Sequence, residues 1–182
     1  MRIYIPTIIV VVIDQISKQF ASSELSAFPL DVTNKQSINE LTNKINKEYG
    51  RIDILVNSAA IDPKFDKDSD TSSYSKFTEF PKEMWAQSIS VNLTGTFLVC
   101  REAIPYLLQT QGSIVNVSST TALAGIPYSA AYAASKAGVL ALTKSLAVEY
   151  AKKGLQVNCV NPGGIKTAMT RMPPIDDIDM DL

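Results

Sequence analysis

The sequence predicts an α/β fold in which helices cover a doubly wound parallel sheet. Short apolar runs alternate with segments of helical periodicity along the 182 residues, which is typical of a parallel sheet packed against helices. The composition, 46% hydrophobic and 19% charged, is that of a globular protein. No internal repeat or low-complexity linker divides the chain, so residues 1–182 are expected to form a single Rossmann-like domain.

Charge and residue content exclude several classes of function. The formal net charge is -1 and the chain has no basic run, so neither nucleic acid nor an anionic membrane surface is an expected partner. The absence of histidine excludes Ser-His-Asp and Cys-His triads and every metal site with a histidine ligand. Cys100 and Cys159 lie in apolar stretches rather than in a CxxC pair, and are expected to be reduced residues of a cytoplasmic protein.

The first apolar run, residues 3–13, is open to more than one interpretation. With Met1 and Arg2 before it, the run resembles the hydrophobic region of a signal peptide or an N-terminal anchor. It is shorter than the roughly 20 apolar residues of a membrane span, and no A-x-A-like site follows it closely. A buried parallel strand over Thr7–Ile13 is therefore the favoured prediction, within an atypical N-terminus of residues 1–26.

A strand, a helix and a second strand are predicted next. The strand covers Ala27–Leu30. Thr33 and Gln36 have the spacing of a capping box, so the helix is expected to start there and to end at Gly50. The second strand is predicted over Ile52–Val56, another short apolar run.

The middle of the chain is predicted to be an irregular segment followed by helices. Asp62–Phe80 is polar and without periodicity, as in loops that determine specificity. A helical region begins at Pro81 and continues into a second helix over Thr94–Gln109, which Pro105 is expected to kink or locally loosen.

The remaining elements are two strands on either side of a long helix. Ser113–Val117 and Leu155–Val160 are the predicted strands, and the helix covers Tyr132–Lys153. The last residues, 173–182, are rich in aspartate and are expected to be a frayed tail.

The strongest local signal for chemistry is the sequence Tyr-Ala-Ala-Ser-Lys at 132–136. On a helix, positions i and i+4 share one face, so the phenol of Tyr132 and the ammonium of Lys136 would be neighbours. A nearby positive charge stabilises a phenolate and lowers the pKa of a tyrosine from about 10 towards the range of a general acid or base. The alternative is a chance pair, a surface tyrosine beside a solvated lysine.

Polar residues after several predicted strands strengthen the interpretation of a catalytic site. Ser119 follows the strand before Tyr132, and open α/β sheets place ligand-contacting groups at such strand ends. The sequence resembles the short-chain dehydrogenase/reductase family over about residues 27–172. The resemblance is carried by Asp31 in LDVT, NSAA at 57–60, Asn92 in VNLTG, GSIVNVSS, YAASK and NPGGIKT.

The resemblance implies hydride transfer between a nicotinamide cofactor and a small-molecule alcohol or carbonyl substrate. In the family, the residue that matches Tyr132 is the general acid and base, while the one that matches Lys136 lowers its pKa and binds the nicotinamide ribose. Ser119 would polarise the substrate oxygen, and Asn92 would hold a water that links Lys136 to solvent. The alternatives are that Ser119 caps a turn and that Asn92 is a buried amide bonded to the backbone.

The resemblance also implies a set of cofactor contacts. They are Asp31 and Val32 at the adenine, Asn57, Ala59 and Ala60 in the cofactor cleft, and Pro162, Gly163, Ile165 and Thr167 on the nicotinamide side. Asp14 ends the predicted strand Thr7–Ile13, where a carboxylate would bind a ribose 2′-hydroxyl and repel a 2′-phosphate. NAD is therefore expected rather than NADP, unless Asp14 is simply a solvated acid at a strand end.

Two departures from the family pattern leave a second function open. The family usually has NNAG where this sequence has NSAA, and its first strand and glycine-rich phosphate loop have no counterpart before Gly50, the first glycine. The alternative to an active oxidoreductase is a catalytically impaired family member that acts as a subunit or interaction module. The resemblance further implies a homodimer or homotetramer, paired through the helices Thr94–Gln109 and Tyr132–Lys153.

Overall fold

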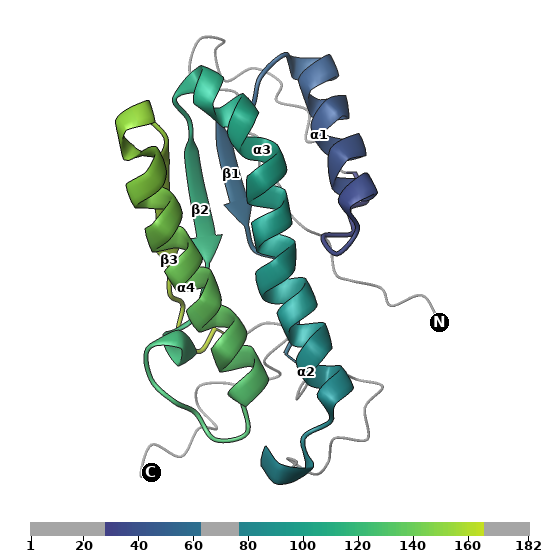
Figure 1. The fold of residues 1–182 in the computed structure, drawn as a ribbon, viewed down its shortest axis with the longest axis vertical. Helices are drawn as coiled ribbons and strands as arrows, with labels where there is room; N and C mark the ends of the chain where they lie inside the picture. The colour runs from purple at the N-terminus through teal and green to yellow at the C-terminus, as the bar shows by residue number, and fades with distance from the viewer. Residues whose placement is uncertain (1–27, 63–76, 166–182) are drawn as a thin grey trace.

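Three parallel strands form the sheet in the part of the chain that the structure describes. The structure is a computed structural model, and it describes residues 28–62 and 77–165 (Figure 1). In chain order, its elements are α1 (Lys35–Tyr49), β1 (Ile54–Asn57), the 3-10 helix η2 (Phe77–Glu79), α2 (Lys82–Ser88), the π-helix η3 (Ile89–Gly95), α3 (Thr96–Thr110), β2 (Ser113–Val117), the 3-10 helix η4 (Thr120–Ala122), α4 (Ala130–Tyr150), the 3-10 helix η5 (Ala151–Lys153) and β3 (Gln156–Val160).

The strand order in the sheet is β1-β2-β3. In the first pair Ile54 lies opposite Ser113, and in the second pair Ser113 lies opposite Gln156. Each parallel connection passes through helices, because α2, η3 and α3 lead from β1 to β2, and α4 leads from β2 to β3. The predicted Rossmann-like α/β class with a parallel sheet is confirmed.

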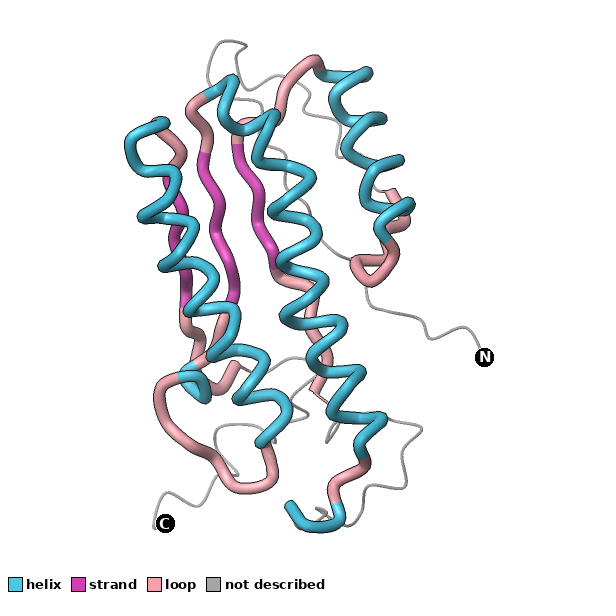
Figure 2. The backbone as a smooth tube through the Cα atoms, viewed as in Figure 1, coloured by secondary structure: helices cyan, strands magenta, loops and turns pink. Residues whose placement is uncertain are grey.

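Helices α3 and α4 lie side by side over one face of the sheet, and α1 lies next to α3 (Figure 1 and Figure 2). Alternate strand residues, such as Leu55 and Ile114, point into this layer and are buried. They form one apolar core with Ile38 and Ile45 of α1 and Leu107 of α3. Since the three strands are parallel, their carboxyl ends meet at one edge, where the predicted site residues follow.

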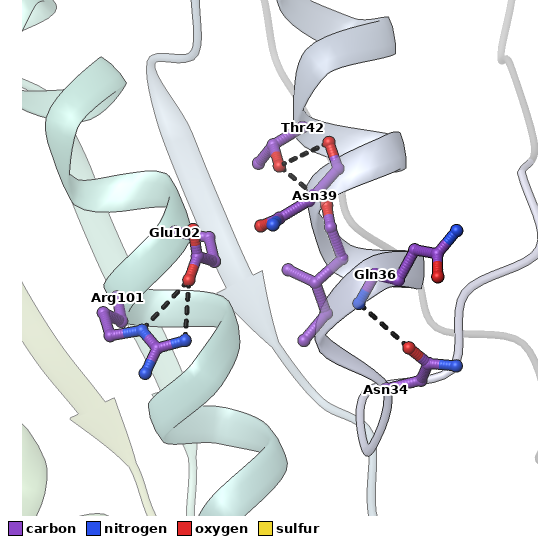
Figure 3. Close-up of polar contacts among 7 residues, drawn as sticks. Asn34, Gln36, Asn39, Thr42, Arg101 and Glu102 are labelled. Carbon is purple, nitrogen blue, oxygen red and sulfur yellow. Dashed lines mark hydrogen bonds and ion pairs between the residues drawn. The ribbon is translucent and has the colours of Figure 1, made fainter.

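Asn34, and not Thr33, caps α1. The Asn34 side chain accepts hydrogen bonds from two backbone N–H groups of the first turn, and Figure 3 shows the one from Gln36, at 2.9 Å. The predicted capping box of Thr33 and Gln36 is wrong, because the N–H and the hydroxyl of Thr33 both donate to Oδ1 of Asp31. Gly50 ends the helix as predicted, with a φ of 74° that favours glycine.

The predicted strands differ from the observed ones mainly at their first residues. Residues 28–30, within the predicted strand Ala27–Leu30, form no strand. The other two differences are that β1 starts after Ile52 and β3 starts after Leu155. Ile52 and Leu155 are nevertheless buried in the core, so their apolar character marks burial rather than a place in the hydrogen-bonded sheet.

The helical region that begins after Pro81 changes geometry at Ile89–Gly95, where η3 is a π-helix. Pro105 was the expected point of disturbance, but α3 continues through it to Thr110. The long helix predicted over Tyr132–Lys153 is observed as α4 followed by the short η5. The π-helix was not predicted, and it contains one of the candidate catalytic residues.

Several predictions lie outside the described residues. These are the strand Thr7–Ile13, Asp14, most of the loop Asp62–Phe80, Thr167 and the tail 173–182. Within residues 28–62 and 77–165, no helix combines the length and the hydropathy needed to cross a bilayer.

Candidate active site

Tyr132 and Lys136 lie one turn apart near the start of α4. Lys136 is 2% exposed, and its Nζ donates a hydrogen bond to the carbonyl oxygen of Val117, the last residue of β2, at 2.7 Å. The same Nζ lies 5.6 Å from the centroid of the Tyr132 ring. The phenol and the ammonium are therefore neighbours, and the lysine is not the solvated surface residue of a chance pair.

The surroundings of Tyr132 keep its hydroxyl protonated. Burial raises the pKa of Tyr132 above its ordinary value of 10.0, and the nearby Asp62 carboxylate raises it further. A side-chain hydrogen bond with Ser119 acts in the opposite direction. The sequence predicts a lowered pKa, and this direction is wrong for the described surroundings because the loss of hydration is the largest influence on the Tyr132 pKa. At neutral pH Tyr132 is thus in the form of a general acid.

Burial has the opposite effect on the lysine. It lowers the pKa of Lys136 from 10.5 to about 8, and Cys159 acts weakly in the other direction. An ammonium that has lost its hydration releases its proton more easily. A pKa near the working range lets a lysine exchange protons while most molecules still carry its positive charge at pH 7.

Ser119 lies two residues after the end of β2 and directly precedes the turn η4. Its Oγ accepts a hydrogen bond from the backbone N–H of Thr121 at 3.2 Å, and its side chain also bonds to Tyr132. The neighbouring Ser118 donates from Oγ to the carbonyl oxygen of Lys136 at 2.8 Å and so ties α4 to the end of β2. The structure thus brings Ser119, Tyr132 and Lys136 together, and it also shows the turn-capping contact that was the alternative for Ser119.

Asn92 lies in η3 and is fully buried. Its Oδ1 accepts from the backbone N–H of Ile61 at 2.8 Å, and its Nδ2 donates to the Ile61 carbonyl oxygen at 2.9 Å and to Ser135 Oγ at 3.0 Å. These bonds use the amide oxygen and both N–H groups, which is the arrangement of a buried structural amide. The water relay at Asn92 stays a prediction. Since the side chain of Asn92 is fully hydrogen-bonded, only a backbone group of η3 is available to bind that water.

Asn57 ends β1, and its side chain joins a buried polar network. Its Nδ2 donates to Asn116 Oδ1 at 2.9 Å and to Cys100 Sγ at 3.2 Å, and Asn116 Nδ2 donates to Thr143 Oγ1 at 2.9 Å. Burial raises the pKa of the Cys100 thiol to about 12, so this thiol is unreactive. The Asn57 side chain connects strands to helices, and its contact with a cofactor remains a prediction.

The two residues predicted to contact adenine have different surroundings. Asp31 is exposed, and its Oδ1 accepts hydrogen bonds from the N–H and the hydroxyl of Thr33, at 2.9 and 2.7 Å. Val32 is buried against η3, so its side chain belongs to the core and only its backbone is left for the predicted contact. Ala59 and Ala60, which were predicted to line the cofactor cleft, are partly buried beyond the end of β1.

The segment after β3 lies next to η4. The carbonyl oxygen of Pro162 accepts from the N–H of Thr120 at 3.0 Å. Oδ1 of Asn161 is buried and has no hydrogen-bond partner among the described residues. Gly163 has open space where a side chain would stand, and Ile165 is exposed.

Two residues of this site were missed from the sequence. Ser135 Oγ donates to the carbonyl oxygen of Tyr132 at 2.7 Å and accepts from Asn92. Asp62 is buried, and its charge acts on Tyr132. Ser135 could have been predicted from its position inside the YAASK motif. Asp62 could have been predicted from its position in the loop that follows the strand β1.

The chain is similar to known proteins in sequence and in structure. A family model described as short chain dehydrogenase matches residues 9–175. The chain is 41% identical over 152 residues to 3-oxoacyl-(acyl-carrier-protein) reductase FabG of Thermotoga maritima, covering 83% of this chain and 58% of that protein. It is 36% identical over 146 residues to 5-keto-D-gluconate 5-reductase of Escherichia coli, covering 80% of this chain and 54% of that protein.

The solved structure "ElxO with NADP Bound" matches with a TM-score of 0.70 at 41% identity, covering 78% of this chain and 54% of the other. The chain thus spans about half the length of the curated relatives it matches.

Proposed function

Because the chain belongs to the short-chain dehydrogenase family, we propose that it is an oxidoreductase that transfers a hydride between a nicotinamide cofactor and an alcohol or carbonyl substrate. The observation that carries the proposal is the grouping of Ser119, Tyr132 and Lys136 after the carboxyl end of β2. A partly buried phenol that keeps its proton, beside a lysine with a pKa of about 8, is a suitable proton source for a developing alkoxide. As expected from the sequence, we place this enzyme in the cytoplasm.

The three side chains divide the proton chemistry between them. In carbonyl reduction, Tyr132 donates its proton to the substrate oxygen as negative charge develops there, and in alcohol oxidation the phenolate takes a proton back. The hydroxyl of Ser119 hydrogen-bonds to Tyr132, and we assign its one O–H proton to the substrate oxygen once that oxygen lies between the two side chains. Lys136 returns a proton to Tyr132 from the side of Val117. The bound nicotinamide supplies or accepts the hydride.

We propose that Tyr132 and Lys136 bind the ribose of the cofactor and that the segment from Pro162 to Ile165 binds its nicotinamide. The family uses NAD or NADP, and the preference for NAD rests on Asp14 alone. The similar structure of ElxO was solved with NADP, so it does not favour NAD. Fluorescence titration with NADH and NADPH measures the preference, and tighter binding of NADPH would overturn it.

Tyr132→Phe tests the proposed function. The variant keeps the ring and removes the proton donor, so kcat with NADH and a panel of ketones and aldehydes is expected to fall about 100-fold or more. Binding of NADH should weaken by no more than about tenfold, the cost of one hydrogen bond to the ribose. The control is Tyr106→Phe, which removes a hydroxyl that bonds to Asn43 of α1 at 3.3 Å.

Two outcomes would contradict the proposal. Turnover of Tyr132→Phe within a few-fold of the parent would remove Tyr132 from its role. A parent chain that binds neither NADH nor NADPH would favour the alternative of a subunit or interaction module.

A further inference from the structure

A series of four hydrogen bonds starts within the first turns of α4 and reaches the loop that follows β1. Ser135 Oγ donates to the carbonyl oxygen of Tyr132 at 2.7 Å and accepts from Asn92 Nδ2 at 3.0 Å. Asn92 in turn bonds both backbone groups of Ile61, the N–H at 2.8 Å and the carbonyl oxygen at 2.9 Å. The series therefore runs from the candidate general acid, through the π-helix η3, to the residue before Asp62.

The donors and acceptors of this series fit in only one way. A serine hydroxyl has one proton, which Ser135 gives to the carbonyl oxygen of Tyr132, so its lone pairs receive the N–H of Asn92. The amide of Asn92 cannot be turned over, because its oxygen faces an N–H of Ile61 and its NH2 group faces a carbonyl. Ser135 and Asn92 are both 0% exposed, so water does not replace a lost partner.

Close packing of α4 against η3 brings the two side chains within reach of each other. A Cβ added to Gly138, one turn after Ser135, would stand 2.6 Å from the side chain of Leu93 in η3. The glycine permits this approach, and at such a separation a side chain as short as serine reaches the amide of Asn92.

We propose that Ser135 is a positioning residue for Tyr132, which holds the first turn of α4 against Asn92 and thereby sets where the phenol stands relative to Ser119. This role rests on the proposed function, in which the Tyr132 hydroxyl must reach the substrate oxygen. Ser135 bonds to the backbone of Tyr132 and is fully buried, so its effect on the reaction would pass through Tyr132. A displacement of about 1 Å between reacting groups costs an enzyme up to roughly 100-fold in rate, so a loosened turn has a measurable effect.

Ser135→Ala removes both hydrogen bonds of the hydroxyl and adds no atoms. We expect kcat to fall about tenfold or more, with the Kd for NADH changed less than about twofold. Ser135→Thr keeps the hydroxyl but adds a methyl group at a fully buried position, so it should recover only part of the lost rate. The matched control is Thr143→Ala, which removes a buried hydroxyl of the same helix that bonds to the Val139 carbonyl oxygen at 2.8 Å and to Asn116 at 2.9 Å. The control should keep kcat within about twofold.

A second measurement needs no turnover. NMR of tyrosines labelled at the ζ carbon, assigned with Tyr132→Phe, follows the ionisation of Tyr132, whose charged neighbours are Lys136 and Asp62. In Ser135→Ala the pKa of Tyr132 should move down towards its ordinary value of 10.0, because a looser turn is better hydrated. In Thr143→Ala it should not move. Should Ser135→Ala fail to fold, Ser135→Cys replaces it, with a smaller change in the same direction.

The outcomes separate this proposal from the proposed function. An unchanged Tyr132 titration in Ser135→Ala, or equal losses of kcat in Ser135→Ala and Thr143→Ala, would overturn the positioning role. An inactive parent with a shifted Tyr132 titration would overturn the proposed function and support the positioning role.

Discussion

Asp62 brings a negative charge close to Tyr132, where the family resemblance implies Lys136 as the charged neighbour. Its place in the loop after β1 is fixed by Ile61, since both backbone groups of Ile61 bond to Asn92. A carboxylate near a phenol disfavours the phenolate, while a nearby ammonium favours it. Asp62 therefore acts on Tyr132 in the same direction as burial, and both raise the pH at which Tyr132 changes from acid to base.

Asp62→Asn is expected to lower the pKa of Tyr132, because the amide has the shape of the carboxylate without its charge. Alcohol oxidation needs the phenolate, so the pH at which kcat/KM for oxidation reaches half its maximum should move down. The control is Glu83→Gln, an acid in the first turn of α2, which should leave the profile unchanged. An oxidation profile that stays in place or moves up would contradict this role for Asp62.

Lys136→Met is expected to stabilise the fold while it removes turnover. The pKa of Lys136 is about 8 in the folded protein against an ordinary 10.5, so the unfolded chain binds more protons between these values and stability rises with pH there. Methionine avoids the burial of a charge, and at pH 7 it should raise the free energy of unfolding by on the order of 1–3 kcal/mol. Urea unfolding at both ends of the pH range measures this, with Lys144→Met on the same helix as the control. A less stable variant would mean that the bond to Val117 outweighs the loss of hydration.

The sequence motifs predicted which residues would lie together at the site. They did not predict the pKa of Tyr132 or the hydrogen-bond partners of Asn92. The grouping of Ser119, Tyr132 and Lys136 follows from strand ends and helical spacing, which are local properties. The direction of the shift in the Tyr132 pKa depends on burial and on Asp62. The spacing of residues along the sequence gives no information about either. The contacts of Asn92 likewise join segments far apart in the chain, so either alternative for its amide was compatible with the sequence.

At the scale of elements, apolar periodicity predicted the helices and the parallel strands more accurately than their ends. Burial produces the periodic signal, and residues such as Ile52 and Leu155 are buried just outside their strands. The π-helical geometry of η3 could not be predicted, since local residue preferences do not distinguish a π-helix from an α-helix. Its central residue Asn92 bonds to Ile61 and Ser135, which are distant in the chain.

Gly112→Ala is expected to disturb the start of the β1–β2 pair. An added Cβ would collide with the backbone carbonyl oxygen of Asp53, which accepts from the N–H of Ser113 at 2.8 Å and cannot swing aside as a side chain does. The free energy of unfolding should fall by about 1–3 kcal/mol in urea denaturation. Gly125→Ala is the matched control, because nothing lies within 4 Å of its Cβ position. Equal stability of Gly112→Ala and the parent would contradict this account.

At the scale of the whole molecule, the outer faces of α3 and α4 present apolar and small side chains. Phe97 of α3 is 43% exposed and Val148 of α4 is 81% exposed. Ala137 and Ala141 are also exposed on α4, and small residues at this spacing allow another helix to approach closely. These are the two helices through which the family resemblance implies pairing, and the homo-oligomer remains our prediction.

Sedimentation velocity at micromolar concentration is expected to show a homodimer or homotetramer, and Ala141→Arg is expected to shift it to monomers. In a two-fold interface each residue acts from both copies, so one substitution brings two guanidinium groups into the same contact. The control is Ala86→Arg, which changes an exposed alanine of α2 in the same way and should leave the oligomer intact. A monomeric parent would refute pairing altogether. An oligomer that tolerates Ala141→Arg as well as Ala86→Arg would place the interface away from α4, because a buried like-charge pair without a counter-ion is too costly to accommodate.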